Sequence, residues 1–257
     1  MNRVAVYVDG FNLFYALRAA KAKWLNLGAL CDGICGKVGT VEHIKYFTAH
    51  VDGDGDQGRP MRQQAYIRAI SSDERVSVCL GSFMRKRIER PVERLLIANS
   101  TLFLPDTINR IPQGLHRVVQ ANGSEKCLSV HDRSFLEEVK PRNPVYARVL
   151  TREEKGSDVN LSVTMLNDAW RNEYDTAIVL SNDSDLCEPI RIVCSELCKK
   201  VVIGYVPQDP KRVKVSDRLK VVASGVFHVK WPMLRRNQLP DKVITRTGSV
   251  VTKPEGW

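Results

Sequence analysis

The stretch that decides the fold is VAVYVDGFN, which occupies residues 4 to 12. Its apolar part, residues 4 to 8, ends at Asp9, and apolar residues at helical spacing follow Asn12. A short apolar run that leads through a turn into a helix is typical of a strand buried in a parallel sheet. We therefore expect a strand over residues 4–8 and a helix over residues 12–23.

The same pattern returns at residues 177 to 185, which read AIVLSNDSD. Similar patterns predict strands at 44–51, 76–80, 146–150, 176–181, 201–206 and 227–230. They predict helices at 60–70 and 217–223, a helix that begins near residue 157, and a helix that begins shortly before Pro189. Strands that alternate with helices predict an α/β fold, namely a three-layer α/β/α sandwich around a mostly parallel central sheet.

Three segments depart from this regular alternation. Residues 84–145 contain several prolines and many basic residues, so we expect an insertion in a domain that spans residues 1–240. Residues 241–257 form a polar C-terminal tail that we expect to be partly mobile. Residues 28–40 carry four glycines and are predicted to be a loop.

The helix expected from residue 157 has an apolar stripe. Val159, Val163, Leu166 and Trp170 lie at helical spacing and trace one face of it.

Four aspartates lie where such folds build active sites. Asp9 and Asp183 follow apolar strands, Asp185 comes two residues later, and Asp158 lies in the segment before another helix. In open parallel sheets ligands bind beyond the carboxyl ends of the strands, so separate segments can bring these carboxylates to one edge. Like charges that close repel, and the cluster therefore calls for a cation, Mg²⁺ or Mn²⁺.

These positions also have a simpler interpretation. Asp9 could cap the helix that follows it, and Ser184 or Asp185 could cap the helix after the second strand. If capping is their only role, it must explain why aspartates follow two separate strands in the same way.

The composition is that of an ordinary soluble globular protein with a basic surface. The chain has 257 residues, 43% of them hydrophobic, and 39 Lys and Arg against 29 Asp and Glu, for a net charge of +10. A basic body around an acidic pocket suits a polyanionic substrate. We find neither an apolar stretch long enough for a membrane span nor a signal peptide, and seven cysteines without disulfide-like spacing indicate a reducing, cytoplasmic setting.

Three segments together resemble one known family. The chain opens with a strand and DGFN at residues 9–12, has EKGSDV at residues 154–159, and has SNDSD after a strand at residues 181–185. These segments are similar to the D-G-x-N, E-K-G-x-D-V and S-G-D-x-D motifs of the NYN family of PIN-like ribonucleases, in particular its LabA-like branch. Asn182 replaces the usual glycine, and we expect the turn to survive because Asn tolerates left-handed backbone angles.

The resemblance implies a metal-dependent ribonuclease site. It places the acidic, divalent-metal-binding positions at Asp9, Asp158, Asp183 and Asp185. It further implies that Asn12 and Ser181 orient carboxylates or water, and that Lys155 is the nearby cation. Carboxylate-held metal suits phosphodiester hydrolysis because it activates water and stabilises negative charge. A non-catalytic RNA-binding or scaffold protein and a 5′-nuclease-like DNA nuclease remain as alternatives.

The strongest basic patch begins the expected insertion, at Arg85, Lys86, Arg87, Arg90 and Arg94. The last three could share a helix face and contact RNA phosphates, although a proline interrupts that helix. The expected partner is single-stranded or structured RNA. Whether the chain also forms a homo-oligomer or binds a protein partner is left open.

Base-stacking candidates are Trp24, Tyr15 and Phe83, for each of which packing in the core is the alternative.

Overall fold

The computed structural model describes residues 2–36, 38–53, 56–92, 95–98, 101–103, 116–119, 125–128, 137–139, 145–211 and 214–257. It divides into two compact units. The first comprises Met1–Met84 and Glu154–Trp257, and the second comprises Arg85–Glu153. The boundary between them falls inside two long strands, β3 (Val76–Val92) and β9 (Val145–Lys155).

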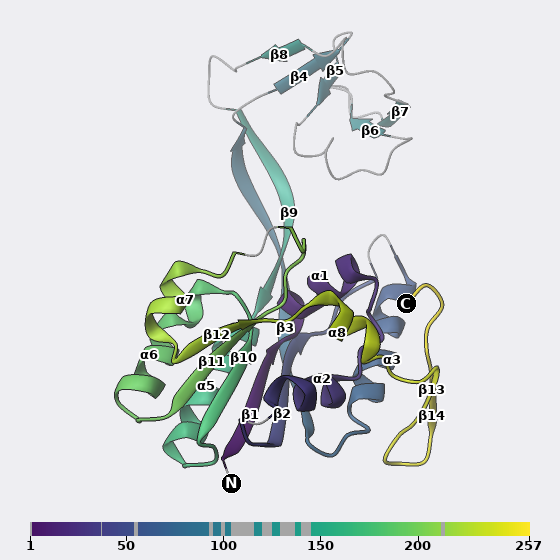
Figure 1. The fold of residues 1–257 in the computed structure, drawn as a ribbon. Helices are drawn as coiled ribbons and strands as arrows, with labels where there is room; N and C mark the ends of the chain where they lie inside the picture. Colours follow the sequence, from purple (N-terminus) through teal and green to yellow (C-terminus); the bar gives the residue numbers. More distant parts are fainter. Residues whose placement is uncertain are drawn as a thin grey trace. The chain divides into compact units, whose positions relative to one another are not determined.

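The first unit is built on a seven-stranded sheet with the order β12-β11-β10-β1-β2-β3-β9 (Figure 1). Its remaining strands are β1 (Arg3–Asp9), β2 (Thr40–Ala49), β10 (Thr176–Leu180), β11 (Lys200–Tyr205) and β12 (Gly225–His228). Every neighbouring pair from β12 to β3 is parallel, which confirms the expected mostly parallel sheet.

The helices lie on both faces of this sheet. They are α1 (Gly10–Ala20), α2 (Leu27–Cys35), α3 (Gly58–Ile70), α5 (Ser157–Trp170), the 3-10 turn η1 (Ser184–Leu186), α6 (Cys187–Ser195), α7 (Asp217–Val222) and α8 (Trp231–Arg236). Side chains of β1 alternate between two cores: Val4, Val6 and Val8 pack with α1, α2, α3 and α8, whereas Ala5 and Tyr7 pack with α5, α6 and α7. This two-sided packing is the three-layer α/β/α sandwich that the sequence predicts.

The strand register brings two motif segments together. In the parallel pairing of β1 with β10, Val8 lies opposite Leu180. The next residues along each strand, Asp9 and Ser181, therefore leave the sheet at the same edge, as strand ends do in a parallel sheet.

Helix α5 buries a different face from the apolar stripe that its spacing indicates. Leu161, Met165 and Ala169 are buried, whereas Val159 is 64% exposed and Trp170 is 78% exposed. Both faces carry apolar side chains, so spacing alone does not select between them.

A polar anchor on the buried face of α5 explains the choice. The Asp168 carboxylate is buried and accepts hydrogen bonds from the Tyr7 hydroxyl and the Lys45 ammonium, each at 2.6 Å. These partners, from β1 and β2, fix the helix to the sheet, and an aspartate with two partners can be buried at low cost.

The glycine-rich segment contains helix α2, so the loop prediction over residues 28–40 is wrong there. The Asn26 side chain caps the helix by accepting a hydrogen bond from the Ala29 N–H at 3.0 Å. Leu27, Leu30 and Cys31 are buried, and this burial outweighs the low helix propensity of glycine.

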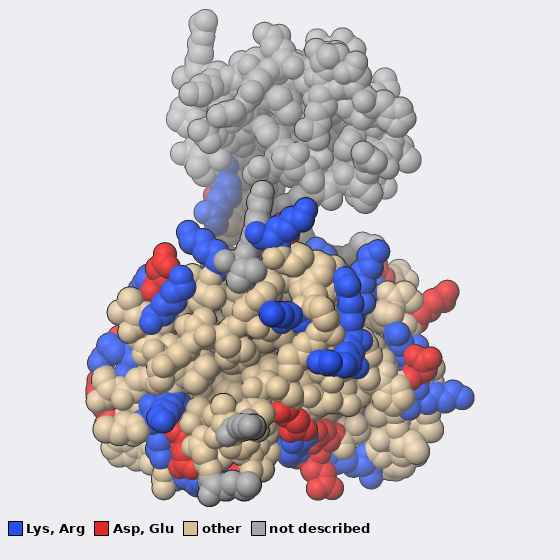
Figure 2. All heavy atoms as spheres, viewed as in Figure 1, with Lys and Arg blue, Asp and Glu red and all other residues tan. Residues whose placement is uncertain are grey.

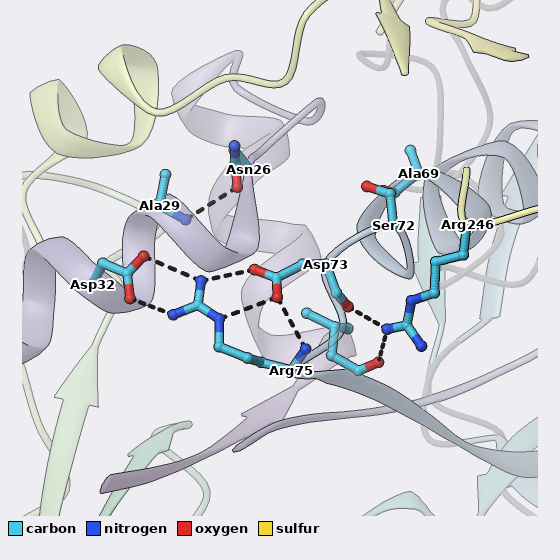
Figure 3. Close-up of polar contacts among 9 residues, drawn as sticks. Asn26, Ala29, Asp32, Ala69, Ser72, Asp73, Arg75 and Arg246 are labelled. Carbon is cyan, nitrogen blue, oxygen red and sulfur yellow. Dashed lines mark hydrogen bonds and ion pairs between the residues drawn. The ribbon is translucent and has the colours of Figure 1, made fainter. Parts of the chain in front are cut away.

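An arginine cluster explains one of the helix glycines (Figure 3). Arg75 forms ion pairs with Asp32 of α2 at 2.6 Å and with Asp73 at 2.8 Å. A Cβ atom on Gly28 would lie 2.1 Å from an Asp73 carboxylate oxygen, so only glycine fits beside this cluster. Arg246 also hydrogen-bonds to the Asp73 carbonyl, which ties the C-terminal segment to the same place.

The C-terminal segment is ordered by packing, unlike the mobile tail that we expect. Strands β13 (Lys242–Ile244) and β14 (Val250–Thr252) pair antiparallel and bury Val243 and Val251. Trp257 then lies against Trp24 and Tyr66, with ring centroids 6.1 and 5.5 Å away.

The second unit consists of short strands. A three-stranded sheet has the order β5-β4-β8, and a two-stranded sheet pairs β6 with β7. Their bounds are β4 (Leu95–Ala98), β5 (Thr101–Phe103), β6 (His116–Val119), β7 (Glu125–Leu128) and β8 (Glu137–Val139). Among the helices of the described ranges, none is long and apolar enough to cross a membrane.

Candidate active site

Asp9 is a buried carboxylate at the junction of β1 and α1. One of its oxygens accepts the Asn12 N–H at 3.0 Å, so it caps the helix, and the other accepts the Ser181 hydroxyl at 2.9 Å. Burial raises the pKa of Asp9, and the negative charge of Asp183 adds to this, while its hydrogen bonds to Asn12 and Ser181 act against it. Capping and a site role are therefore compatible at this position.

Ser181 connects Asp9 to the next carboxylate. Its hydroxyl oxygen accepts the Asp183 N–H at 3.1 Å while donating to Asp9. Asp183 in turn caps η1 by accepting the Asp185 N–H at 2.9 Å. The sequence suggested Ser184 or Asp185 as the cap, and the structure assigns that bond to Asp183.

Asp158 lies in the first turn of α5, just after Gly156, whose φ of +95° favours glycine. Its pKa is raised to about 6, first by burial and then by the negative charges of Asp9, Asp183, Glu154 and Asp185. The other three predicted aspartates, Asp9, Asp183 and Asp185, therefore lie within electrostatic range of Asp158.

Glu154 is a further carboxylate that our prediction of the site did not include. Its side chain accepts the Ser157 N–H at 3.0 Å, and its charge acts on Asp158. The sequence feature that could have identified Glu154 as a site residue is its position at the start of the EKGSDV segment. Nearby, a Cβ atom on Gly81 would lie 2.7 Å from the Lys155 carbonyl oxygen, so glycine permits β3 to pass close beneath this segment.

Asn182, which stands where the family pattern has glycine, does not adopt the left-handed conformation that we expected. Its side chain instead accepts the Ser216 N–H at 2.9 Å and donates to the Lys214 carbonyl at 3.2 Å. The residue therefore holds the segment before α7 against the site edge. Asn12 and Ser181 line one crevice beside it.

A cavity of about 390 Å³ opens beside the acidic cluster. Lys155, Asp158 and Asp185 contribute its polar walls. Val159 and Val163, two of the exposed apolar residues of α5, line it as well, so part of the unexpected apolar stripe borders the site.

The donor set fits a hard divalent cation in its chemistry. Carboxylate oxygens are the ligands that Mg²⁺ and Mn²⁺ prefer, and the repulsion felt by Asp158 would be relieved by a positive charge. The Ser157 hydroxyl, buried next to Asp158, finds no hydrogen-bond partner among the described residues. Within the same residues, no three His, Cys, Asp or Glu side chains are already close enough to hold a metal.

The predicted RNA-binding patch belongs to the second unit, where the expected helix is a strand. Arg85, Lys86, Arg87 and Arg90 are exposed on β3, and Arg94 lies outside the described residues. Strand side chains alternate, so Arg87 and Arg90 point to opposite faces rather than sharing one. This strand, β3, pairs with β9, and the Thr151 hydroxyl of β9 donates a further hydrogen bond to the Lys86 carbonyl at 3.2 Å.

The three stacking candidates separate in the structure. Trp24 is fully buried and belongs to the core. Phe83 packs edge-on against Phe11, with centroids 5.7 Å apart, and Tyr15 is 42% exposed.

The chain is similar to one protein family and to two known proteins. A family model of the NYN domain matches residues 119–229. The 6-hydroxy-3-succinoylpyridine 3-monooxygenase HspA of Pseudomonas putida is 24% identical over 263 aligned residues, which cover 99% of this chain and 75% of that protein. The activity in that name belongs to that protein, and identity at this level does not define the reaction of this chain.

A solved structure is also similar. It is the crystal structure of a protein of unknown function from Vibrio parahaemolyticus, with a TM-score of 0.45 and 16% identity over 89% of this chain and 93% of that chain.

The range matched by the family model contains the segments that hold Asp158, Asp183 and Asp185, whereas Asp9 precedes it. The NYN domain match supports the assignment of this chain to the NYN domain family.

Proposed function

We propose that this protein is a metal-dependent ribonuclease that hydrolyses RNA phosphodiester bonds at the edge formed by Asp9, Asp158, Asp183 and Asp185. The observation that supports this most is the raised pKa of Asp158, which reflects its burial first and then the negative charges of Asp9, Asp183, Asp185 and Glu154 around it. A cluster of like charges is costly unless a cation joins it, and family members of this kind are typically nucleases.

In this proposal the four aspartates would hold Mg²⁺ or Mn²⁺, which supplies activation of water and stabilisation of negative charge. The chain's own residues prepare the site. Ser181 fixes the orientation of the Asp9 carboxylate through its 2.9 Å hydrogen bond, and the Asn12 N–H fixes its other oxygen. Lys155, on the wall of the acidic cavity, would attract the substrate phosphate.

The direct test is cleavage of labelled RNA by the purified full chain. We expect cleavage with Mn²⁺ or Mg²⁺, none in excess EDTA, and a loss of at least about a hundredfold in turnover for Asp9→Asn and Asp183→Asn. RNA affinity should change little. Asp241→Asn removes the same charge from a side chain that is 84% exposed, and this control should cleave at the wild-type rate.

The result also separates the alternatives. Cleavage in excess EDTA would overturn the metal site. Binding of RNA without cleavage, in every metal tested, would favour a non-catalytic RNA-binding protein on this fold. Preferential cleavage of labelled DNA in a parallel reaction would favour the DNA nuclease.

The exposed basic residues of β3 give the proposal a second, independent test. Arg87→Glu with Arg90→Glu should weaken RNA binding and flatten its dependence on salt, since each phosphate contact contributes to the slope. Turnover at saturating RNA should remain near that of the wild type. An unchanged salt slope would show that RNA does not contact this strand.

A further inference from the structure

A second and larger cavity lies in the first unit, outside the acidic cluster. Its volume is about 550 Å³, within the range typical of small-molecule sites. Residues of α1, β2 and α3 line it together with Trp257. None of the predicted metal or catalytic residues contributes to this lining.

The inner wall of this cavity is aromatic. Tyr46 and Tyr66 are buried with ring centroids 6.3 Å apart, and Tyr66 lies 5.5 Å from Trp257. The Tyr66 hydroxyl donates to the Leu25 carbonyl at 3.2 Å, so its ring is held in place. A cavity with aromatic rings in its wall suits a planar aromatic ligand.

The outer wall is strongly basic. Arg18, Lys23, Arg59 and Arg62 line the cavity. Among the described residues of its lining, only Asp56 is acidic, and it pairs with Arg62. The pKa of Lys23 is lowered by burial and by the positive charges of Arg62 and Arg18. Two arginines close enough to lower the pKa of this lysine indicate a place where an anion would be stabilised.

Basic side chains also lie on the surface near α1. In Figure 2, Lys and Arg side chains gather over the part of this face where Figure 1 shows α1 and α8. An anionic ligand would therefore approach through a favourable field.

The cavity adjoins the acidic site through two residues. Gly10, directly after Asp9, lines the cavity, and a Cβ atom on it would lie 2.8 Å from the Tyr46 ring. Burial raises the pKa of Tyr46, and the negative charge of Asp9 adds to this shift. The aromatic wall thus begins one residue away from the carboxylate cluster.

We propose that this cavity binds one nucleotide of the RNA substrate, with its base against Tyr46 and Trp257 and its phosphate at Arg18 and Arg59. The inference rests on the proposed ribonuclease function, because it assigns the substrate's position on the same enzyme. A base needs the aromatic wall and a phosphate needs the basic wall, and this cavity offers both.

The test is calorimetric titration of the full chain with uridine 5′-monophosphate, in EDTA so that cleavage plays no part. We expect saturable binding, weaker binding of uridine, and weaker binding still of inorganic phosphate. Arg18→Gln with Arg59→Gln should weaken nucleotide binding about tenfold or more but leave uridine binding nearly unchanged. Arg68→Gln, an exposed arginine on α3 that does not line the cavity, is the matched control.

An aromatic variant completes the design. Trp257→Leu should weaken both nucleotide and nucleoside, and Trp170→Leu, which removes an exposed tryptophan elsewhere, should weaken neither. Absence of saturable nucleotide binding, or tighter binding of a simple heteroaromatic acid such as nicotinate, would overturn the nucleotide assignment. Cleavage of RNA without nucleotide binding would contradict this inference alone. Nucleotide binding without any cleavage of RNA would contradict the proposed function.

Discussion

The two ends of α5 hold two aspartates with opposite surroundings. Near its C-terminal end, Asp168 is buried with two donors, the Tyr7 hydroxyl and the Lys45 ammonium. In its first turn, Asp158 is half-buried, and the charges that shift its pKa come from other carboxylates. Asp168 therefore has partners that stabilise its charge, whereas burial and the neighbouring carboxylates disfavour the charge of Asp158. The surroundings of Asp168 indicate a structural role, whereas those of Asp158 agree with the proposed metal site.

The largest effect that would sharpen this comparison is the loss of protein stability when Asp168 is replaced. Asp168→Ala leaves Lys45 and the Tyr7 hydroxyl without their acceptor, and loss of one partner of a buried pair costs about 3–5 kcal/mol. We expect the midpoint of urea unfolding to fall accordingly. Asp241→Ala, at an exposed position, should change the free energy of unfolding by less than about 0.5 kcal/mol. An equally small change at Asp168 would mean that the buried pair contributes nothing to the fold.

The next effect has the opposite sign and concerns metal. In EDTA, Asp158→Asn should melt at a higher temperature than the wild type, because one repelling charge is gone. Mn²⁺ at a hundredfold excess over its Kd should stabilise the wild type by about 2.7 kcal/mol and the variant by less. Thermal melts of both proteins, with EDTA and with Mn²⁺, measure this.

Two outcomes of those melts would break the comparison. A wild type that is indifferent to Mn²⁺ would remove the metal site. A variant that melts below the wild type in EDTA would mean that Asp158 stabilises the fold as Asp168 does.

The same helix shows how far sequence reasoning reaches. The strand ends at Asp9 and Asp183 were predictable, because apolar runs and polar turns are local patterns, and parallel register then brings such ends together. The buried face of α5 was not predictable, since its deciding feature is an aspartate whose partners come from β1 and β2, more than 120 residues away. Patterning treats such a residue as surface.

Long-range contacts also explain the other differences. Helix α2 forms in a glycine-rich segment because Leu27, Leu30 and Cys31 are buried, and Gly28 leaves room for the Asp73 carboxylate from the segment before β3. The basic residues after Met84 form a strand because Pro91 disfavours a helix and β9 offers pairing partners. The C-terminal segment packs because Trp257 finds Trp24 and Tyr66. In each case the deciding partner is remote in sequence.

The smallest expected effect is the pH dependence of the difference between wild type and Asp158→Asn in EDTA. The pKa of Asp158 is raised in the folded state to about 6, above its unfolded value. Between these two values the folded state binds more protons than the unfolded state, so the free energy of unfolding contributed by this group falls as pH rises. Below both values Asp158 is protonated in both states and causes no penalty, and above both the penalty is complete. Chemical unfolding of the two proteins should be measured between pH 4 and pH 7.5. The free energy of unfolding of the wild type, relative to that of the variant, should decrease steadily as pH rises toward about 6 and then level off. A salt-bridged aspartate gives the reverse slope, because its folded pKa lies below the unfolded value. A difference that is constant with pH, or that favours the wild type as pH rises, would show that Asp158 has a stabilising partner and that the two ends of α5 are alike.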